Sequence, residues 1–394
     1  MTPMVADSDL GLLLTAAKKA AAEGRISQAR EFYSAALRTH PERPEVLLPL
    51  ALIHESASEF AEMAALLQRL VASAPHDPRA HHELGLCLLR LGRTDEGIAS
   101  LGRAVELAPS DAAAHCNLGL ALEDRGDLAA AADALRQALR LDPHCAFIAY
   151  HLAAVNARAG RPFAAPPCCP PDYLLKLFNA YAPRFDRHLF QSLRYRGPML
   201  LADAVQNAPP QSARPKPWDI LDLGCGTGMT ALPFRDSARS ILGVDLAPRM
   251  LEHAARRTTR DGKLVYDDLL QADIVAAARS KPDCYDLVLA ADVFIYLGDL
   301  LPVFSAVHGA LRDGGLFAFT VEAWTGSDDY RLLPTRRYAQ SSPYIRTLAQ
   351  RVGFAEISRH TAAIRLGEDQ RPVSGYIFLL RKSPTSPPPR PDAR

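Results

Sequence analysis

Features that would mark a membrane, secreted or metal-binding protein are missing from this sequence. No apolar run approaches the roughly 20 residues that a membrane-spanning helix needs. The N-terminus lacks the charged and then apolar segments of a secretory signal. The seven cysteines are odd in number and include no C-x-x-C pair, so they predict neither a disulfide framework nor a zinc site. These absences predict a cytoplasmic protein with no membrane contact and no bound metal.

An excess of basic residues is missing as well. Residues 1–163 contain 16 Lys and Arg against 20 Asp and Glu, a net charge of −4. The remaining residues contain 29 against 24, a net charge of +5. Nucleic-acid-binding proteins gather positive charge on one face or in one domain. The charge balance therefore predicts no nucleic-acid partner, and the length of 394 residues predicts two or three domains.

The first half of the chain contains a repeat of 34 residues. Four prolines stand 34 positions apart, namely Pro41, Pro75, Pro109 and Pro143. This is the repeat length of tetratricopeptide (TPR) units, which are helix–turn–helix pairs. Small and apolar residues recur in the same register, as Leu84-Gly85 and Leu118-Gly119 illustrate. The pattern predicts an all-α TPR solenoid over residues 1–160, with a capping helix and four units near 10–43, 44–77, 78–111 and 112–145.

Proline-rich segments flank the second half of the chain. Residues 161–172 hold five prolines, which exclude a continuous helix and predict a stiff linker. Residues 383–394 have few apolar side chains and predict a disordered tail. Between them, residues 173–382 alternate predicted strands and helices, which is typical of an α/β Rossmann-like doubly wound sheet. Two closing strands, near 355–365 and 374–381, predict an antiparallel strand at the edge of that sheet.

The most informative stretch is Asp222-Leu-Gly-Cys-Gly-Thr-Gly228, which directly follows the apolar run at 218–221. Glycine tolerates positive φ and allows the backbone to approach a ligand closely. A helix after such a turn aims its free N–H groups at the ligand. The dinucleotide fingerprint is G-x-G-x-x-G, but Met229 stands where its third glycine would be. The spacing therefore argues against a dinucleotide-dependent oxidoreductase.

With Asp222 two positions before its first glycine, this loop resembles the cofactor loop of class I methyltransferases, which use S-adenosyl-L-methionine (SAM). The resemblance covers about residues 173–382 and implies the class I methyltransferase fold. Together with the repeats, the chain looks like the bacterial TPR-containing predicted methyltransferases. The resemblance implies that the methionine end of the cofactor is held by Asp222, Gly224, Cys225, Gly226, Thr227 and Gly228. We interpret Cys225 as a small packing residue rather than a reactive thiol.

A second group of predicted cofactor contacts follows the next strands. Asp245 lies 19 residues after Gly226, and a carboxylate at about this distance can accept both hydroxyl protons of a ribose. A surface or helix-capping Asp is the alternative. Leu246 would offer an apolar face to the adenine, and the resemblance implies that Asp273 accepts the adenine amino hydrogens. The predicted set is completed by Ile274 and Ala291.

Two further segments resemble parts of this family. Residues 178–196 resemble the lid helices that precede the core of small-molecule-type SAM methyltransferases. The resemblance implies an aromatic ring, Tyr181 or Phe185, over the methionine part of the cofactor, where a sulfonium cation over a ring face is favourable. The alternative is an amphipathic helix whose aromatic residues belong to the core. Residues 330–341 also resemble this group and predict a wall of the substrate pocket.

The sequence does not identify a catalytic residue. A sulfonium methyl is already activated, so the protein's main tasks are to align the reacting atoms and to exclude water. A general base is needed only for a nucleophile that carries a proton. Asp292, Tyr296 and His188 are candidates by position alone, and a structural or cofactor-supporting role is favoured for each. Asp292 is followed by Val-Phe-Ile rather than Pro-Pro-aromatic, which argues against enzymes that methylate flipped DNA bases.

These observations predict a SAM-dependent methyltransferase with an unidentified acceptor, a small molecule being slightly favoured over a protein. The repeats predict a platform whose groove holds a protein or peptide partner. The alternative is a TPR adaptor whose SAM-binding domain is catalytically silent.

Overall fold

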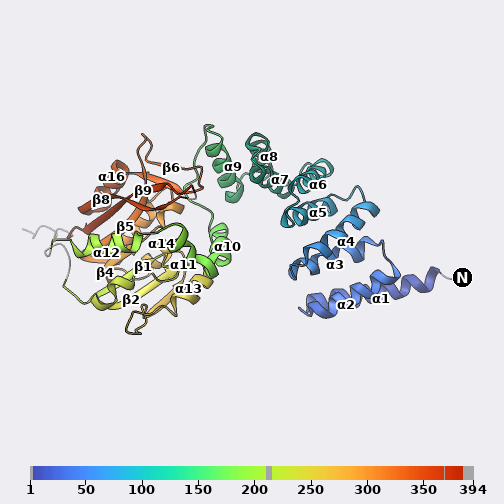
Figure 1. Cartoon of the computed structure of the whole chain (residues 1–394), viewed down its shortest axis with the longest axis horizontal. Helices are drawn as coiled ribbons and strands as arrows, with labels where there is room; N and C mark the ends of the chain where they lie inside the picture. The colour runs from blue at the N-terminus through green and yellow to red at the C-terminus, as the bar shows by residue number, and fades with distance from the viewer. Residues whose placement is uncertain (1–2, 210–214, 368, 385–394) are drawn as a thin grey trace, which may run out of the picture. The chain divides into compact units, whose positions relative to one another are not determined.

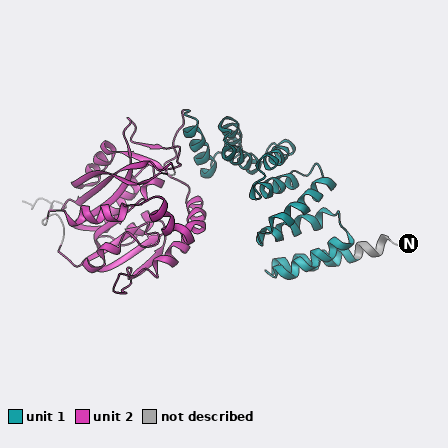
Figure 2. Cartoon of the chain, viewed as in Figure 1, with its two compact units in different colours: residues 1–161 teal, residues 162–394 magenta. Residues whose placement is uncertain are grey.

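The computed structural model describes residues 3–209, 215–367 and 369–384. The chain divides into two compact units, residues 1–161 and 162–394 (Figure 2). The predicted disordered tail falls outside the described residues from position 385 onward. Among the described helices, none combines the length and the apolar content that crossing a bilayer requires.

The first unit consists of helices throughout, as the 34-residue repeat predicts. They pair as α1 with α2, α3 with α4, α5 with α6 and α7 with α8, and α9 packs against α8. Their bounds are α1 Pro3–Ala22, α2 Ile26–Thr39, α3 Pro44–Ser56, α4 Phe60–Ser73, α5 Pro78–Arg90, α6 Thr94–Leu107, α7 Ala112–Arg125, α8 Leu128–Leu141 and α9 Ala146–Arg158. The helix starts at positions 44, 78 and 112 repeat every 34 residues, in the register of the prolines.

The repeat has a local physical cause at its helix starts and crossings. Asp77 and Asp111 cap α5 and α7 by accepting hydrogen bonds from backbone N–H groups of the first turn. Gly85 and Gly119 allow the paired helices to pack closely. A Cβ atom at either glycine would lie 2.7 Å from a leucine Cγ of the partner helix. Each unit thus packs its two helices closely against each other and also packs against the neighbouring pair.

The second unit is a mixed sheet with helices on both faces (Figure 1). Its strands are β1 Trp218–Leu223, β2 Ala238–Asp245, β3 Asp268–Gln271, β4 Tyr285–Ala290, β5 Leu311–Trp324, β6 Tyr330–Leu332, β7 Tyr338–Ser341, β8 Phe354–Leu366 and β9 Pro372–Lys382. Its helical elements are α10 Pro171–Tyr181, η1 Ala182–Arg184, α11 Phe185–Arg187, η2 His188–Ser192, α12 Gly197–Gln206, η4 Leu232–Ser237, α13 Pro248–Ala254, α14 Ile274–Ser280, η5 Phe294–Tyr296, α15 Leu301–Ala310 and α16 Ser342–Val352.

The strand order is β3-β2-β1-β4-β5-β7-β6, with β9 also paired to β5 and β8 paired to β9. Strands β1 to β5 are parallel, whereas β9 runs antiparallel to both β5 and β8. The long strand β5 therefore divides its pairing, because residues 316–322 bond β9 and residues 322–324 bond β7. The predicted fold class is confirmed, including its antiparallel strands. The hairpin of β6 and β7 was not foreseen from the sequence.

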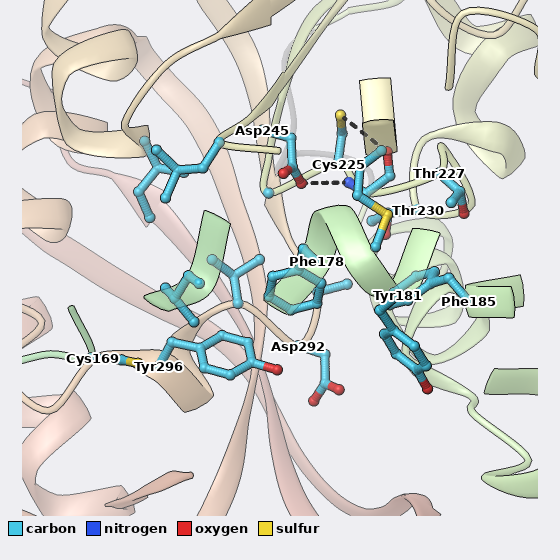
Figure 3. Close-up of a pocket in the computed structure, with 18 of the residues that line it drawn as sticks. Cys169, Phe178, Tyr181, Phe185, Cys225, Thr227, Thr230, Asp245, Asp292 and Tyr296 are labelled. Atoms are coloured by element: carbon cyan, nitrogen blue, oxygen red, sulfur yellow. Dashed lines mark hydrogen bonds between the residues drawn. The ribbon is translucent and has the colours of Figure 1, made fainter. Parts of the chain in front are cut away.

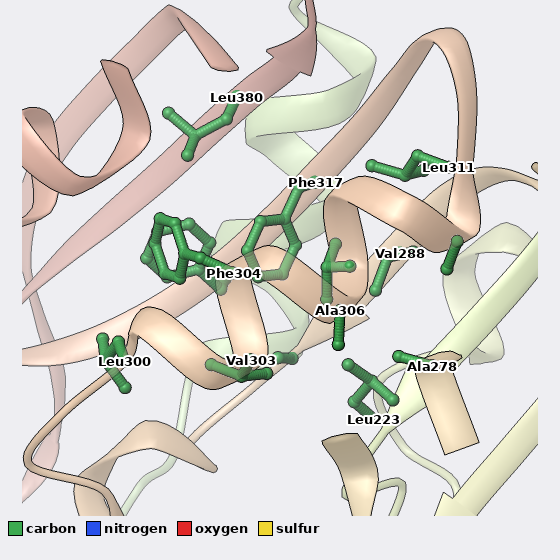
Figure 4. Close-up of a cluster of buried hydrophobic side chains, with 14 of the residues drawn as sticks. Leu223, Ala278, Val288, Leu300, Val303, Phe304, Ala306, Leu311, Phe317 and Leu380 are labelled. Carbon is green, nitrogen blue, oxygen red and sulfur yellow. The ribbon is translucent and has the colours of Figure 1, made fainter. Parts of the chain in front are cut away.

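Two apolar clusters pack on opposite faces of the sheet. Alternate residues of β1 and β4 separate into them, since Leu221 and Val288 join one cluster and Ile220 and Leu287 join the other. The first cluster lies under α14, α15 and α16, where Phe304 packs on Phe317 (Figure 4). The second lies under α12 and α13. Strands buried on both faces are typical of parallel sheets. Because helices cover both faces, a ligand-binding site can form only at the ends of the strands.

The proline-rich segment predicted as a linker belongs to the second unit in this structure. The Cys169 N–H donates to the Tyr296 carbonyl at 2.9 Å, and the Gly298 N–H donates to the Pro167 carbonyl at 2.8 Å. The Tyr338 hydroxyl donates to the Pro166 carbonyl at 2.8 Å. These bonds hold residues 166–169 against the loop that follows β4 and against β7.

Candidate functional site

A cavity lies at the carboxyl ends of β1, β2 and β4, and residues of α10, η1 to η2 and their flanks line its other side (Figure 3). Ligands of open α/β sheets bind at this edge. The lining contains thirteen residues that the sequence predicts as cofactor-binding or catalytic: Tyr181, Phe185, Gly224, Cys225, Gly226, Thr227, Asp245, Leu246, Asp273, Ile274, Ala291, Asp292 and Tyr296. Three other predicted residues, Asp222, Gly228 and His188, lie outside the lining.

The glycine loop adopts the backbone conformation for which its composition is suited. Gly224, Gly226 and Gly228 all have positive φ, at 65°, 53° and 93°, a region that residues with a Cβ rarely adopt. A Cβ at Gly224 would lie 2.5 Å from Val293 Cγ2, so space as well as φ requires glycine there. A Cβ at Gly226 would meet only the Phe185 ring, at 3.7 Å. Gly226 is thus the glycine whose bare face lies toward the cavity and its lid.

The helix expected directly after the glycine loop is replaced by turns and the short 3₁₀ element η4. Only nine residues separate Gly228 from the start of β2 at Ala238, and Pro233 stands at the start of η4. An α-helix with free N–H groups aimed at a ligand does not form in this space. The prediction of such a helix is therefore wrong. The N–H groups of Cys225 and Gly228 donate to the carbonyls of Val244 and Cys225.

Asp245 closes the loop from the neighbouring strand. Its Oδ2 accepts the Gly226 N–H at 2.9 Å, and its Oδ1 accepts the Ala247 N–H at 2.8 Å. Burial raises the pKa of Asp245, and these backbone bonds oppose the rise. The start of α13 is capped at Ala247 without a side-chain hydrogen bond. The Asp245 carboxylate thus lies at the cavity wall (Figure 3), where its bond to the Gly226 N–H fixes its position.

Asp222 supports the loop from below. Its side chain is completely buried, and its Oδ2 accepts the Tyr266 hydroxyl at 2.7 Å. Burial raises the pKa of Asp222 to about 7, although the bond from Tyr266 lowers it. Tyr266 also packs where Gly228 has no side chain, because a Cβ there would lie 2.8 Å from the ring. Asp222 and Gly228 therefore shape the turn from behind the cavity wall.

The residues predicted to contact the adenine gather at the ends of β2 and β3. Leu246, Asp273 and Ile274 line the cavity. β3 ends at Gln271, two residues earlier than predicted, and Asp273 is the N-cap of α14. Its Oδ1 accepts the N–H groups of Val275 and Ala276 at 2.9 and 3.0 Å. One carboxylate oxygen of Asp273 is thus committed to the start of α14.

The predicted lid covers the glycine loop and is fastened to it. The rings of Tyr181 and Phe185 meet edge to face with centroids 5.3 Å apart. Asp186 accepts hydrogen bonds from the Thr227 hydroxyl and from the Arg257 guanidinium. Arg257 Nε also donates to the Thr227 carbonyl at 3.0 Å. One carboxylate of the lid therefore joins α11 to the loop and to the segment after α13.

The three candidate bases separate in the structure. Asp292 and Tyr296 line the cavity (Figure 3), whereas His188 is hydrogen-bonded to the Tyr181 hydroxyl outside the lining. β4 ends at Ala290, and Asp292 has a positive φ of 58°. Strained backbone of this kind clusters at functional sites. Burial raises the pKa of Tyr296 to about 12, which makes its phenol a hydrogen-bonding group rather than a base at neutral pH.

Sequence reasoning missed the partners of Asp292. Arg365 of β8 is almost completely buried, with 1% of its side chain exposed. It donates to Asp292 Oδ1 at 2.6 Å and to Glu322 Oε2 at 2.5 Å. Burial opposes the charge of Arg365, but the two carboxylates raise its pKa. No local signal could have found this group, because Asp292 and Arg365 are 73 positions apart and meet only through the sheet order.

The interpretation of Cys225 agrees with its surroundings. The thiol is buried beside Asp222 and Asp245. Burial, with the charges of these carboxylates, raises the pKa of Cys225 well above its usual range. A thiolate is therefore disfavoured, and Cys225 acts as a small packing residue of the loop.

Comparison with protein-family models assigns both halves of the chain. The model "Methyltransferase domain" matches residues 221–317, which include the end of β1, strands β2 to β4, the glycine loop and Asp245. The model "Tetratricopeptide repeat" matches four overlapping stretches between residues 14 and 165.

Curated relatives match parts of the second half. The ubiquinone biosynthesis O-methyltransferase of Cereibacter sphaeroides is 30% identical over 97 residues, which cover 25% of this chain and 38% of the relative. The malonyl-[acyl-carrier protein] O-methyltransferase of Halalkalibacterium halodurans is 31% identical over 114 residues, covering 28% and 41%. An uncharacterized protein of Haemophilus influenzae is 28% identical over 138 residues, covering 34% and 54%. The chain thus spans about half or less of the length of these relatives.

Among solved structures, magnesium protoporphyrin IX methyltransferase from Synechocystis PCC 6803 is similar at a TM-score of 0.40 and 16% identity. The similarity covers 54% of this chain and 97% of the other. The matches to the two family models show that the chain combines a tetratricopeptide-repeat region with a methyltransferase domain.

Proposed function

We propose that the second unit binds SAM in the cavity at the ends of β1, β2 and β4 and transfers its methyl group to a small acceptor. The observation that carries this proposal is the pairing of Gly226 with Asp245. It places a backbone without a side chain beside a fixed carboxylate at the cavity wall. A nucleoside with a ribose diol and a charged amino-acid tail requires this combination.

The chain's own residues divide the work of binding. Asp245 would accept the ribose hydroxyls, and Leu246, Asp273 and Ile274 would surround the adenine. The bare backbone of the loop at Gly226 would lie along the methionine end, with Tyr181 or Phe185 over it from the lid. When bound, SAM supplies a methyl group that its sulfonium has already activated. The lid and its Asp186 latch exclude water from this end, which strengthens every polar contact inside.

Asp292 and Tyr296 would orient the acceptor. Asp292 is held by Arg365, so its carboxylate is positioned and already paired with a guanidinium. This favours hydrogen bonding to a hydroxyl or amine of the acceptor over full removal of a proton. His188 lies outside the cavity lining, and we propose that it supports Tyr181 instead.

A small acceptor is supported by the enclosure of the cavity by α10 and η1 to η2. Two of the relatives are named as O-methyltransferases, one of ubiquinone biosynthesis and one of malonyl-[acyl-carrier protein]. We propose an oxygen nucleophile here too. The repeats would serve separately as a platform for a protein or peptide partner.

Two measurements on the full chain test this function. Isothermal titration calorimetry should show binding of SAM and of S-adenosylhomocysteine, whereas NAD should not bind. Incubation with methyl-labelled SAM and a bacterial lysate should place label in the small-molecule fraction. Label on protein bands would contradict the small acceptor, and cofactor binding with no labelled product would favour the silent adaptor.

A further inference from the structure

We propose that the acceptor end of the cavity recognises a carboxylate on a small, largely apolar acceptor, and that Arg337 and Tyr195 form that carboxylate site. This inference rests on the proposed function, because it names the substrate class of the same cavity. It would make Arg337 the residue that determines specificity.

The cavity has two ends of different character. In Figure 3, Asp245 and Cys225 lie on one side of the Phe178 ring, and Asp292 and Tyr296 lie on the other. The first side is the glycine loop, which the cofactor would occupy. The second side is formed by residues after β4, by the residue before β7 and by residues before α12. It holds the polar groups that the cofactor assignment does not use.

Arg337 is the basic residue of this second side. Among the residues that line the cavity, it alone carries a Lys, Arg or His side chain. Within the described part of the chain it forms no ion pair. Burial raises the pKa values of Tyr296 and Glu322, and the charge of Arg337 lies close enough to oppose both rises. The Asp292 carboxylate already has Arg365 as its partner. The positive charge at the cavity that is still available to a ligand is therefore that of Arg337.

The hairpin that carries Arg337 is held firmly. The Gln340 amide donates to the carbonyls of Phe294 and Leu297 at 3.0 and 2.6 Å. At the turn, the Leu333 N–H donates to the Arg337 carbonyl at 2.8 Å, and Arg336 has a positive φ of 59°. A strained turn fixed from both sides presents the next residue in one place. Such fixed placement is what a recognition residue requires.

Tyr195 supplies an independent sign of a missing ligand. Its side chain is buried, with 8% exposed, and it lines the same cavity. Its hydroxyl is buried without a hydrogen-bond partner among the described residues. The ring is fixed against Gly197, where a Cβ would lie 2.1 Å from the hydroxyl oxygen. Buried hydroxyls are normally paired, so a ligand oxygen that accepts this proton would relieve the cost.

The donor set selects a carboxylate. A guanidinium offers two parallel N–H groups that match the two oxygens of a carboxylate, and a phenol adds a third donor. A cationic group would be repelled by Arg337. The neighbouring wall is apolar and aromatic, with Phe178, Tyr181 and Leu189 in the lining. An acceptor with an aryl or alkyl body and one acid group fits both parts.

The test compares probes that differ only in charge. The full chain, saturated with S-adenosylhomocysteine, is titrated calorimetrically with benzoate and benzamide, and with 4-hydroxybenzoate and 4-hydroxybenzamide. We expect each acid to bind at least tenfold more tightly than its amide. Arg337→Gln should remove that preference, whereas Arg336→Gln, which loses the same charge one residue earlier, should keep it. Tyr195→Phe should weaken the acids several-fold and leave the affinity for S-adenosylhomocysteine unchanged.

Several outcomes would overturn the carboxylate site: equal binding of acids and amides, no binding of either, or equal losses in the Arg336 and Arg337 variants. Phenyl phosphate is included as a third probe, and tighter binding of it through Arg337 would reassign the site to a phosphate. Failure of S-adenosylhomocysteine to bind would instead refute the proposed function. The acid and amide titrations thus test the carboxylate site, and the S-adenosylhomocysteine titration tests the proposed function.

Discussion

Asp245 is fixed before any ligand arrives, because both of its oxygens accept backbone N–H groups from Gly226 and Ala247. We expect Asp245→Ala to weaken SAM binding by about 1.5–3 kcal/mol, as for a hydrogen bond to a charged group. That loss is roughly a 10- to 150-fold rise in Kd. Calorimetry should show no change for Asp236→Ala, which removes an exposed carboxylate from η4. Equal affinities of the wild type and Asp245→Ala would refute the ribose assignment.

The two carboxylates of β1 should respond to pH in opposite directions. Burial raises the pKa of Asp222 to about 7 from an ordinary value of 3.8. The folded chain therefore binds an extra proton between these values, and the stability due to Asp222 falls as pH rises through this window. Burial would also raise the pKa of Asp219, but hydrogen bonds from Ser240 and Arg312 lower it overall. Its contribution is instead present above pH 3.8 and is lost as pH falls below that value.

Urea unfolding of the ligand-free second unit at pH 4 and pH 8 measures this difference. Asp222→Asn should gain stability relative to the wild type on going to pH 8, by on the order of a few kcal/mol. Asp219→Asn should change little in relative stability between these two pH values, because the window of Asp219 lies below pH 3.8. A parallel response of the two variants would contradict the burial of Asp222 as the cause.

The sequence predicted more of the residues on the cofactor side of the site than on the acceptor side. The glycine loop, Asp245 and Asp273 lie in short local patterns, and the structure brings all of them to one cavity. Arg365, Tyr195 and Arg337 have no such pattern. Their significance depends on burial and on partners brought by other strands. Asp222 shows a third case, because a residue predicted from its motif to touch the ligand lies behind the wall.

Helices and strands matched the predictions where a single periodicity dominated the sequence. The 34-residue repeat predicted all four helix pairs, since each helix packs mainly on its neighbours in the chain. In the second unit residues 286–296 form one largely apolar run, but β4 ends at Ala290 and η5 follows. The Asp292 backbone turns there at positive φ. An apolar run alone cannot distinguish a strand from a buried 3₁₀ turn.

The lid is expected to slow the dissociation of SAM. Asp186 is the carboxylate that joins α11 to Thr227 and Arg257. Asp186→Asn removes the charge from that latch while keeping its size. We expect SAM to dissociate about tenfold faster, a change of about 1.4 kcal/mol, with a smaller change in the association rate. Stopped-flow fluorescence measures both rates, and Asp172→Asn, an exposed position on α10, is the matched control. Unchanged dissociation from Asp186→Asn would show that the latch does not retain the cofactor.

On the scale of the whole molecule, the chain has separate apolar cores in its two units. A single unfolding free energy does not describe such a protein, because each unit can unfold in its own transition. The cavity and the residues proposed to hold the cofactor all belong to the second unit.

Ligand binding should therefore stabilise one unit selectively. At a SAM concentration 100 times its Kd, linkage adds about 2.7 kcal/mol to whatever unfolds with the site. For a unit of this size that raises its Tm by on the order of 5–10 °C. Hydrogen exchange during a thermal ramp, read by peptides from each unit, should show the shift in residues 162–384 and not in residues 9–158. The shift should be much smaller in Asp245→Ala at the same SAM concentration. Equal shifts in both units would mean that the repeats and the methyltransferase domain unfold as one cooperative body, so that a partner bound to the repeats would also change the affinity for SAM.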